Sequence, residues 1–417
     1  MVRVMTSPGG QPPVLVVGAG LAGLACALDL VAAGVPVRAL EASDAPGGRM
    51  RTDRRDGFLL DRGFQVFNTS YPQVKRRVQL RALRLSPFTP GALLATASGR
   101  TRFTDPTRRP RESGDLLLGR LARPADLVAL AAMSAADMLF PAQRIIAQPD
   151  RSTLAALRAA RISDELIELF FRPFLAGVFL EDRLETSARF FHLVWRSMLR
   201  GTLCLPRDGI GAVPAQLAGL LPAGTIGYET PVAGLTDDGV ALADGTELPA
   251  RAVVVAAGPA QAAALLPGLP PVRTRMVTTV YHAAPSAPLA EPTLVVDTER
   301  TILNTVVLTQ VARSYSTDGR ALISSSVLGD ATGRESEIVA RLAGLYETDT
   351  SGWEHLASYP VADALPAMPS PWPLTRSARY AAGRYVCGDY RATGSVQGAL
   401  ASGTRAAAEL LADLATV

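Results

Sequence analysis

Short apolar runs alternate with helical periodicity along most of the chain. Residues 14–17 and 35–40 are apolar runs typical of buried strands, and an Ala-rich helical pattern lies between them. Helical periodicity dominates residues 116–200, whereas strand-like runs separated by turn residues dominate residues 225–327. Residues 396–414 again follow a helical pattern. This alternation predicts an α/β protein that begins with a parallel-sheet unit.

The pattern changes several times along the chain, which predicts discontinuous domains. Residues 360–373 are rich in proline, and we predict that they form a connection back to the first domain. The first domain is predicted to contain residues 1–75, 205–268 and 378–417, and the second to contain residues 76–204 and 269–377.

Three glycines, Gly18, Gly20 and Gly23, separate the first strand from the first helix. The first permits a tight turn, the second lets a pyrophosphate approach the backbone, and the third allows the helix to pack closely on the strand. Glu41 ends the second strand, where its carboxylate can accept hydrogen bonds from ribose hydroxyls and disfavours a ribose phosphate. The segment therefore predicts a dinucleotide site with the phosphates at the helix N-terminus.

Composition narrows the class of protein. The chain has 417 residues, of which 48% are hydrophobic and 19% charged, so we expect a large core. The three cysteines, Cys26, Cys204 and Cys387, are too scattered for a disulfide framework or a metal site. The formal net charge of +4 is small, and the basic clusters lack interleaved aromatic residues, which argues against nucleic-acid binding.

The long apolar stretch from residue 14 to residue 40 raises the question of a membrane segment. Its glycines, Asp29, Pro36 and Arg38 argue against a membrane span or a signal peptide, and we expect a cytoplasmic protein. Residues 127–133 are apolar enough to let the helical block touch a membrane surface, although helix packing explains them equally well.

The chain contains further motifs, near both of its ends, that a dinucleotide site alone does not explain. Gly47-Gly48-Arg49 and Asp61-Arg62-Gly63 follow the first unit, and Gly388-Asp389 with residues 394–399 precedes the last helix. With these motifs the chain resembles the flavin-containing amine oxidoreductase superfamily over nearly its whole length. The resemblance implies non-covalently bound FAD in a Rossmann-like domain of the glutathione-reductase type. It also implies that the second domain is a discontinuous α+β substrate domain with a mixed sheet and a helical block.

The resemblance also implies a role for individual residues in holding FAD. Arg49 would supply positive charge near the pyrophosphate and ribityl chain, and Gly63 would lie beside the isoalloxazine ring. The backbone of Val232 would pair with adenine, and Asp389 would accept a hydrogen bond from a ribityl hydroxyl. The amides at residues 395–396 would face the pyrimidine end of the flavin. The implied set is Gly18, Gly20, Gly23, Glu41, Gly47, Gly48, Arg49, Gly63, Val232, Gly388, Asp389, Ser395 and Val396.

Two positions depart from the amine oxidases of this superfamily. Those enzymes commonly place a lysine near the reactive nitrogen of the flavin, and Lys75 is the only lysine in this chain. Lys75 lies in a basic run that is typical of exposed surface. Ser395 stands where many amine oxidases have an aromatic residue. Both departures argue against an amine substrate.

The helical block contains a cluster of aromatic residues between positions 170 and 195. Such a cluster is either part of the core or the wall of an apolar substrate cavity, and the sequence leaves both interpretations open. For a cavity, the candidate wall residues are Phe171, Phe174 and Trp195.

Candidate catalytic residues are few, and none is defined by a motif. His192 is a candidate acid or base if the aromatic cluster lines a cavity. Gln65 follows the loop expected beside the flavin, and Tyr281 lies on a strand expected to form the floor of the pocket. Each is equally consistent with a purely structural role.

The cofactor predicts the reaction class. FAD would take a hydride from a C–H bond of a mostly apolar small organic substrate, in a dehydrogenation or desaturation, and would pass electrons to O2 or another acceptor. Two alternatives stay open: a flavin amine oxidase, and a flavoprotein without net redox turnover, such as an isomerase or a lipophile-binding protein.

Overall fold

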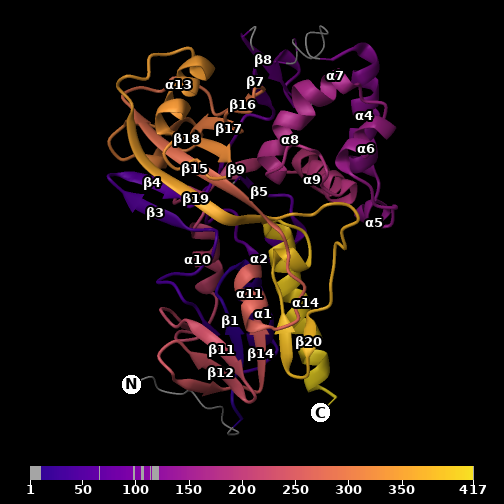
Figure 1. Ribbon diagram of the computed structural model, residues 1–417, viewed down its shortest axis with the longest axis vertical. Helices are drawn as coiled ribbons and strands as arrows, with labels where there is room; N and C mark the ends of the chain where they lie inside the picture. Colours follow the sequence, from indigo (N-terminus) through magenta and orange to yellow (C-terminus); the bar gives the residue numbers. More distant parts are fainter. Residues whose placement is uncertain are drawn as a thin grey trace.

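Two large sheets dominate the computed structural model, which describes residues 11–64, 66–96, 99–104, 108–112, 114 and 122–416 (Figure 1). A six-stranded sheet lies in the lower half of Figure 1 and a seven-stranded sheet in the upper half, with a block of helices beside the latter. The prediction of an α/β protein is confirmed at this level. The predicted domain boundaries stay a prediction.

The six-stranded sheet gathers strands from three separate parts of the chain. Its order is β10 (Ile226–Gly227), β2 (Val37–Leu40), β1 (Val14–Val17), β14 (Ala252–Val255), β21 (Arg384–Val386) and β20 (Arg379–Ala381). All neighbours are parallel except β20, which is antiparallel to β21. All four residues of β1 are buried, as expected for a central strand covered on both faces.

Helices α1 (Leu21–Ala32) and α14 (Val396–Leu414) pack side by side against this sheet (Figure 1). Small residues permit the contact, because a Cβ atom on Gly403 would lie 2.0 Å from the carbonyl oxygen of Ala22. The bounds of α14 match the predicted range. The first and last helices of the chain therefore form one layer, which brings the motifs at the two chain ends together.

Smaller elements surround the six-stranded sheet. Three minor sheets are present in the described ranges. One pairs β3 (Thr52–Arg55) with β4 (Phe58–Asp61), and a second has the order β11 (Val232–Thr236), β12 (Gly239–Leu242), β13 (Glu247–Pro249). The third has the order β5 (Phe67–Asn68), β9 (Leu203–Leu205), β6 (Ser86–Pro87). Among the described residues, the other helices outside the block are α2 (Pro72–Arg77), α10 (Ala212–Ala218), α11 (Pro259–Leu265), α12 (Leu308–Val311) and α13 (Glu335–Tyr346). Short 3-10 helices lie at Pro110–Glu112, Arg313–Tyr315 (η3) and Asp389–Arg391 (η4).

The seven-stranded sheet is mixed and contains the longest strands. Its order is β19 (Glu354–Pro366), β15 (Thr274–Ala284), β18 (Ala321–Leu328), β17 (Asn304–Val307), β16 (Leu294–Asp297), β7 (Ala92–Thr96) and β8 (Gly99–Phe103). Only β16 and β7 pair in parallel among its neighbours.

The proline-rich segment predicted as a connection is partly a strand. β19 extends to Pro366, and Pro360 pairs with Thr278 of β15. The prediction of a connection over 360–373 was therefore wrong for residues 360–366. The strand tolerates its prolines because β19 is the edge of the sheet, where one side of the backbone needs no ladder partner.

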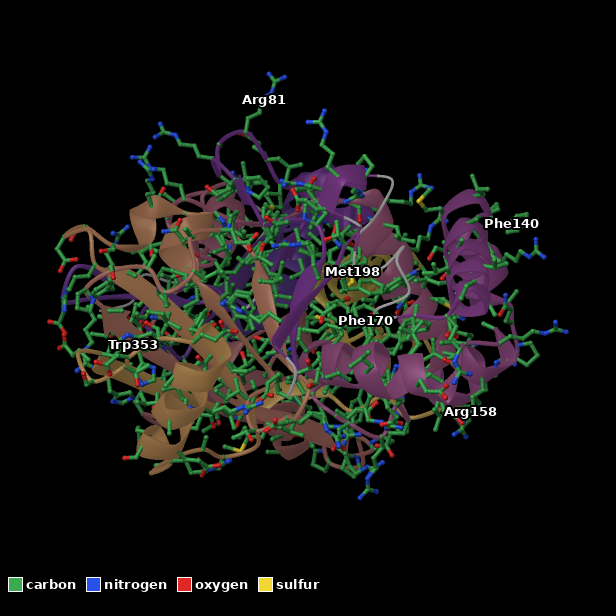
Figure 2. All side chains as sticks on the ribbon, turned by 90° about the horizontal axis from the view of Figure 1, so that it is seen from above. Arg81, Phe140, Arg158, Phe170, Met198 and Trp353 are labelled. Carbon is green, nitrogen blue, oxygen red and sulfur yellow. The ribbon has the colours of Figure 1, made fainter. Side chains whose placement is uncertain are left out.

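The helical block covers one end of the seven-stranded sheet. It consists of α4 (Pro124–Leu139), α5 (Ala142–Ile146), α6 (Thr153–Ala159), α7 (Asp164–Leu166), a π-helical turn at Ile167–Phe171, α8 (Arg172–Phe179) and α9 (Ala188–Arg200). Phe170 stacks on Phe103 of β8 with ring centroids 3.6 Å apart, and Figure 2 shows Phe170 inside the molecule. No helix in the described part of the chain is both long and apolar enough to cross a membrane.

Candidate active site

The first glycine turn has the geometry that an anion site requires. Gly18 adopts a φ of 105°, and a Cβ atom on Gly23 would lie 2.0 Å from the carbonyl oxygen of Gly18. Gly20 is the N-cap of α1 and has no side chain to cap the helix, so the amides of the first turn are not satisfied by a cap. A Cβ atom on Gly20 would meet nothing within 4 Å. The turn therefore presents an uncapped helix N-terminus to open space.

The second glycine motif packs directly on the first. Gly47 forms an isolated parallel bridge with Gly20, and its amide donates to the carbonyl oxygen of Ala19 over 2.9 Å. A Cβ atom on Gly48 would lie 3.6 Å from the Cα atom of Gly20. The backbones of the two glycine motifs are therefore in contact, with no side chain between them. This arrangement suits the close approach of a pyrophosphate.

Glu41 lies at the end of β2, buried beside the first glycine turn. Its Oε2 accepts from the amide of Ala19 over 2.7 Å, and its Oε1 accepts from the amide and hydroxyl of Ser43. A carboxylate offers about four acceptor positions, so one remains on Oε2. The amide of Thr230 donates to the carbonyl oxygen of Glu41, which brings Val232 at the start of β11 close to the same edge of the sheet.

Arg49 and Asp389 connect the motifs from the two chain ends. The Nη2 atom of Arg49 lies 2.7 Å from Oδ1 of Asp389, and Nη1 donates to the carbonyl oxygen of Ala364 over 2.8 Å. The predicted role of Arg49 near the pyrophosphate and ribityl chain stays a prediction, and in the structure Arg49 pairs with Asp389, the residue predicted to contact the ribityl chain. Arg49 also ties both motifs to β19, which contains Ala364.

The C-terminal motif ends in a capped helix. Gly388 is tightly enclosed, because a Cβ atom there would lie 2.3 Å from the ring of Tyr390. The hydroxyl of Ser395 accepts from the amide of Gly398 over 3.1 Å and so caps α14, which begins at Val396. The predicted helix start at Ser395 and Val396 is therefore present, with one of its free amides satisfied by the cap.

The loop after β4 lies on the face of the seven-stranded sheet. Gly63 has a φ of 87°, and a Cβ atom there would lie 3.5 Å from a methyl group of Val361 on β19. The next amide, of Phe64, donates to the hydroxyl of Thr279 on β15 over 3.0 Å. The loop is thus held against neutral and apolar side chains of β15 and β19.

Asp61 anchors this loop through a buried hydrogen-bond hub. Its Oδ1 accepts from the hydroxyl of Thr52 over 2.6 Å and from the amide of Ile210 over 2.9 Å. Its Oδ2 accepts from the hydroxyl of Tyr315 over 2.9 Å, and its carbonyl oxygen accepts from the hydroxyl of Tyr281 over 2.8 Å. One residue therefore joins β3, the start of α10, η3 and β15.

The electrostatics of the hub follow from its burial. Asp61 is 1% exposed, and burial raises the pKa of its carboxyl group from 3.8 to about 6. The bonds from Thr52, Ile210 and Tyr315 stabilise the charged form and act in the opposite direction. The desolvation penalty outweighs them.

The candidate catalytic residues are dispersed. Tyr281 is fully buried, and its hydroxyl serves the Asp61 hub, while burial and the nearby Asp61 charge raise its pKa well above the ordinary value. His192 lies on α9, and its Nδ1 lies 2.8 Å from Oδ2 of Asp137 on α4. Gln65 lies outside the described residues. The structure brings Tyr281, but not His192, into the surroundings of the Gly63 loop.

The aromatic candidates belong to one hydrophobic cluster between the helical block and β7, β8 and β16. Phe171 and Trp195 are buried, with their ring centroids 5.7 Å apart, and Phe174 is partly buried against the same cluster. The indole nitrogen of Trp195 donates to the hydroxyl of Ser134 over 3.0 Å. This packing agrees with a role in the core, and the proposed role as a pocket wall stays a prediction.

The lysine expected at the flavin of an amine oxidase has no counterpart beside this loop. Lys75, the only lysine of the chain, is exposed on α2. Thr279 occupies the position next to Phe64.

The sequence prediction named Asp61 only as part of the Asp61-Arg62-Gly63 motif and gave no individual role to Asp61 or Thr279. The signal for Asp61 was a carboxylate directly after three apolar strand residues, 58–60, all of which are buried. Nothing in the sequence distinguished Thr279 from its neighbours, because its partner Phe64 is supplied by a distant segment.

Comparison with known proteins agrees with this geometry. A family model described as flavin containing amine oxidoreductase matches residues 21–411. The match confirms the resemblance predicted from the motifs at both chain ends.

Two curated relatives illustrate the range of the family. A coproporphyrinogen III oxidase of Propionibacterium freudenreichii subsp. freudenreichii is 26% identical over 343 residues, which cover 67% of this chain and 62% of that protein. A lycopene-forming phytoene desaturase of Pantoea ananas is 40% identical over 86 residues, covering 18% of this chain and 17% of the desaturase. The chain thus spans less than two thirds of the length of either relative.

A solved structure shows the same fold. The cyclohexylamine oxidase of Brevibacterium oxydans IH-35A superimposes with a TM-score of 0.68 at 18% identity, covering 97% of this chain and 100% of that chain.

We predict that Asp61 makes the stability of the protein fall with rising pH. Because its folded pKa is about 6 against 3.8 in an unfolded chain, its contribution is fully present below pH 3.8 and is lost as the pH rises through 6. The difference corresponds to roughly 3 kcal/mol at neutral pH. This contribution is measured as the free energy of unfolding in urea of the wild type and of Asp61→Asn, determined across this pH range. The wild type should lose stability relative to the variant, and parallel profiles would show that Asp61 does not titrate in this way.

Proposed function

The chain belongs to the flavin-containing amine oxidoreductase family, and we propose that it removes a hydride from a C–H bond of a mostly apolar small organic substrate. As a member of this family it is an FAD-dependent oxidoreductase. The observation that carries the choice of substrate is the exposure of Lys75, because no other lysine exists to stand beside the flavin. Among the described residues, the apolar Val361 lies beside Gly63 and the neutral Thr279 accepts from the amide of Phe64.

We propose that FAD lies across the junction of Gly20 and Gly48, in a Rossmann-like domain of the glutathione-reductase type. The uncapped helix N-terminus and the open space beside Gly20 support a pyrophosphate at this point. The acceptor position left on Glu41 supports a ribose hydroxyl, and Val232 lies at the same sheet edge for the adenine. The residues present therefore fit the cofactor at its ADP end.

The flavin end of the cofactor would lie between Gly63 and the start of α14. Asp389 would accept from a ribityl hydroxyl, and this role is supported by the bonds from Arg49 and the amide of Tyr390, which hold its side chain. The first-turn amides of α14 would face the pyrimidine ring and favour negative charge there.

Bound FAD would supply the hydride acceptor, which no amino-acid side chain offers. The residues of the chain position the reacting groups and exclude water. The Asp61 hub fixes the Gly63 loop against β15 and β19. The aromatic cluster would exclude water in its proposed role as a pocket wall. Orientation and exclusion of water suffice for hydride transfer, so no acid or base is assigned.

The names of the curated relatives and of the solved structure suggest compounds for a test of this proposal. Purified holoprotein is mixed without oxygen with coproporphyrinogen III, with phytoene, with an apolar cell extract and with cyclohexylamine, while the flavin absorption is followed. We expect bleaching of the flavin by at least one apolar sample and none by the amine. Bleaching by the amine alone would contradict the proposal and favour an amine oxidase. A spectral shift without bleaching in any sample would favour a flavoprotein without net redox turnover.

We predict that Gly20→Ala weakens FAD binding without unfolding the protein. Gly20 has a φ of −70°, which alanine adopts readily, and the added methyl group would meet no protein atom but would occupy the space proposed for the pyrophosphate. Fluorescence titration of the apoprotein with FAD should show at least a tenfold rise in Kd, with little change in the Tm of the apoprotein.

The matched control is Gly344→Ala on α13, where an added Cβ also meets nothing within 4 Å. FAD affinity should be unchanged there. Equal affinity of Gly20→Ala and the wild type would place the phosphates elsewhere.

We also propose that the outer edge of the helical block contacts a membrane surface. Leu139 is 76% exposed and Phe140 44% exposed at the end of α4, and Figure 2 shows Phe140 at the periphery of the molecule. The guanidinium of Arg144 lies 3.9 Å from the Phe140 ring centroid, so positive charge flanks the apolar residues. Apolar side chains beside basic ones are typical of binding to anionic lipid surfaces.

We predict that Leu139→Glu lowers co-sedimentation of the protein with anionic phospholipid vesicles severalfold, because it introduces a charge into the apolar edge. Leu220→Glu is the control, since Leu220 is 51% exposed but follows α10, away from the helical block. Equal loss in both variants, or no vesicle binding by the wild type, would remove the membrane proposal.

A further inference from the structure

A pocket of about 400 Å³ lies between the two segments that connect the sheets. Residues 269–273, which lead into β15, form one wall, and residues 367–376, which follow β19, form another. Tyr390 and Arg391 of η4 complete the lining. The pocket is therefore separate from the junction of Gly20 and Gly48, although η4 also contains Asp389.

The walls of this pocket combine apolar surface with positive charge. Leucine, valine, alanine, three prolines and Trp372 supply the apolar part, and Arg273, Arg376 and Arg391 supply the charge. None of the described residues that line it is acidic. A site of this composition suits a ligand with an anionic head and an apolar body.

Arg376 and Arg391 are held in place by neutral partners. The guanidinium of Arg376 lies 4.3 Å from the Trp372 ring centroid, and its Nη1 donates to the carbonyl oxygen of Tyr390 over 2.5 Å. Nη2 of Arg391 donates to the carbonyl oxygen of Ser377 over 2.7 Å, while its buried Nε has no hydrogen-bond partner in the structure. Carbonyl groups fix the two side chains without cancelling their charges.

The two charges also act on each other. Burial lowers the pKa of Arg376, and the charge of Arg391 lowers it further. Burial likewise lowers the pKa of Arg391, with Tyr390 and Glu409 opposing the shift. Glu409 is already engaged, since its Oε2 accepts from the hydroxyl of Ser377 and from two backbone amides.

We propose that this pocket binds the carboxylate of a small organic acid, with Arg376 and Arg391 as its charged contacts. Guanidinium groups match the planar carboxylate, and an anion would relieve the repulsion between the two arginines. The prolines and Trp372 would cover the apolar body of the ligand. This site goes beyond the proposed oxidation and does not depend on it.

The test uses benzoate as the probe and the holoprotein as purified, at constant ionic strength. Benzoate should raise the Tm saturably and change the tryptophan fluorescence, whereas the neutral isostere benzamide should do neither. The fluorescence change should vanish in Trp372→Phe, because Trp372 lines the pocket while Trp195 and Trp353 do not. Stabilisation by inorganic phosphate equal to that by benzoate would overturn the assignment to a carboxylate.

Substitutions of single arginines distinguish benzoate binding at this pocket from nonspecific effects of anions on the protein. Arg376→Gln and Arg391→Gln should each raise the Kd for benzoate at least tenfold. Arg158→Gln is the control, since Arg158 is exposed, paired with Asp164 and absent from the pocket lining, and it should bind benzoate like the wild type. An unchanged Kd in Arg376→Gln, or an equal loss in all three variants, would overturn the proposal. Should Arg391→Gln fail to fold, Arg376→Gln and the fluorescence of Trp372→Phe still decide it.

Discussion

The buried carboxylate of Asp61 is the interaction on which the arrangement of the candidate site depends. A buried charge is costly unless donors surround it, and here the donors come from β3, the start of α10 and η3. Satisfying this carboxylate fixes where the N-terminal unit meets the seven-stranded sheet. Gly63 follows two residues later, so the loop proposed beside the flavin is held by long-range contacts rather than by a local turn.

The backbone geometry of the proposed cofactor site could be predicted from the sequence because short segments encode it. A strand, a glycine turn and a helix determine the backbone around Gly18 and Gly20 without help from distant residues. The same holds for Ser395, whose hydroxyl caps the helix that it begins. The motifs at the two chain ends come together because α1 packs on α14, and small residues in these helices permit that contact.

The substrate half could not be predicted because its contacts join distant segments. No pattern in the sequence indicates that His192 on α9 pairs with Asp137 on α4. None indicates that the hydroxyl of Tyr281 donates a hydrogen bond to the carbonyl oxygen of Asp61. Prolines obscured β19, since only its place at the sheet edge makes Pro360 acceptable in a strand. Thr279 became informative only once the fold brought Phe64 beside it.

Both ends of the chain are proposed to form one non-covalent FAD site. The most direct measurement is the visible spectrum of the purified protein, followed by acid precipitation and analysis of the flavin in the supernatant. The account predicts an oxidised flavin spectrum, and release of about one FAD per chain on denaturation. A colourless protein that also fails to bind added FAD, or a flavin that stays with the precipitate, would contradict it.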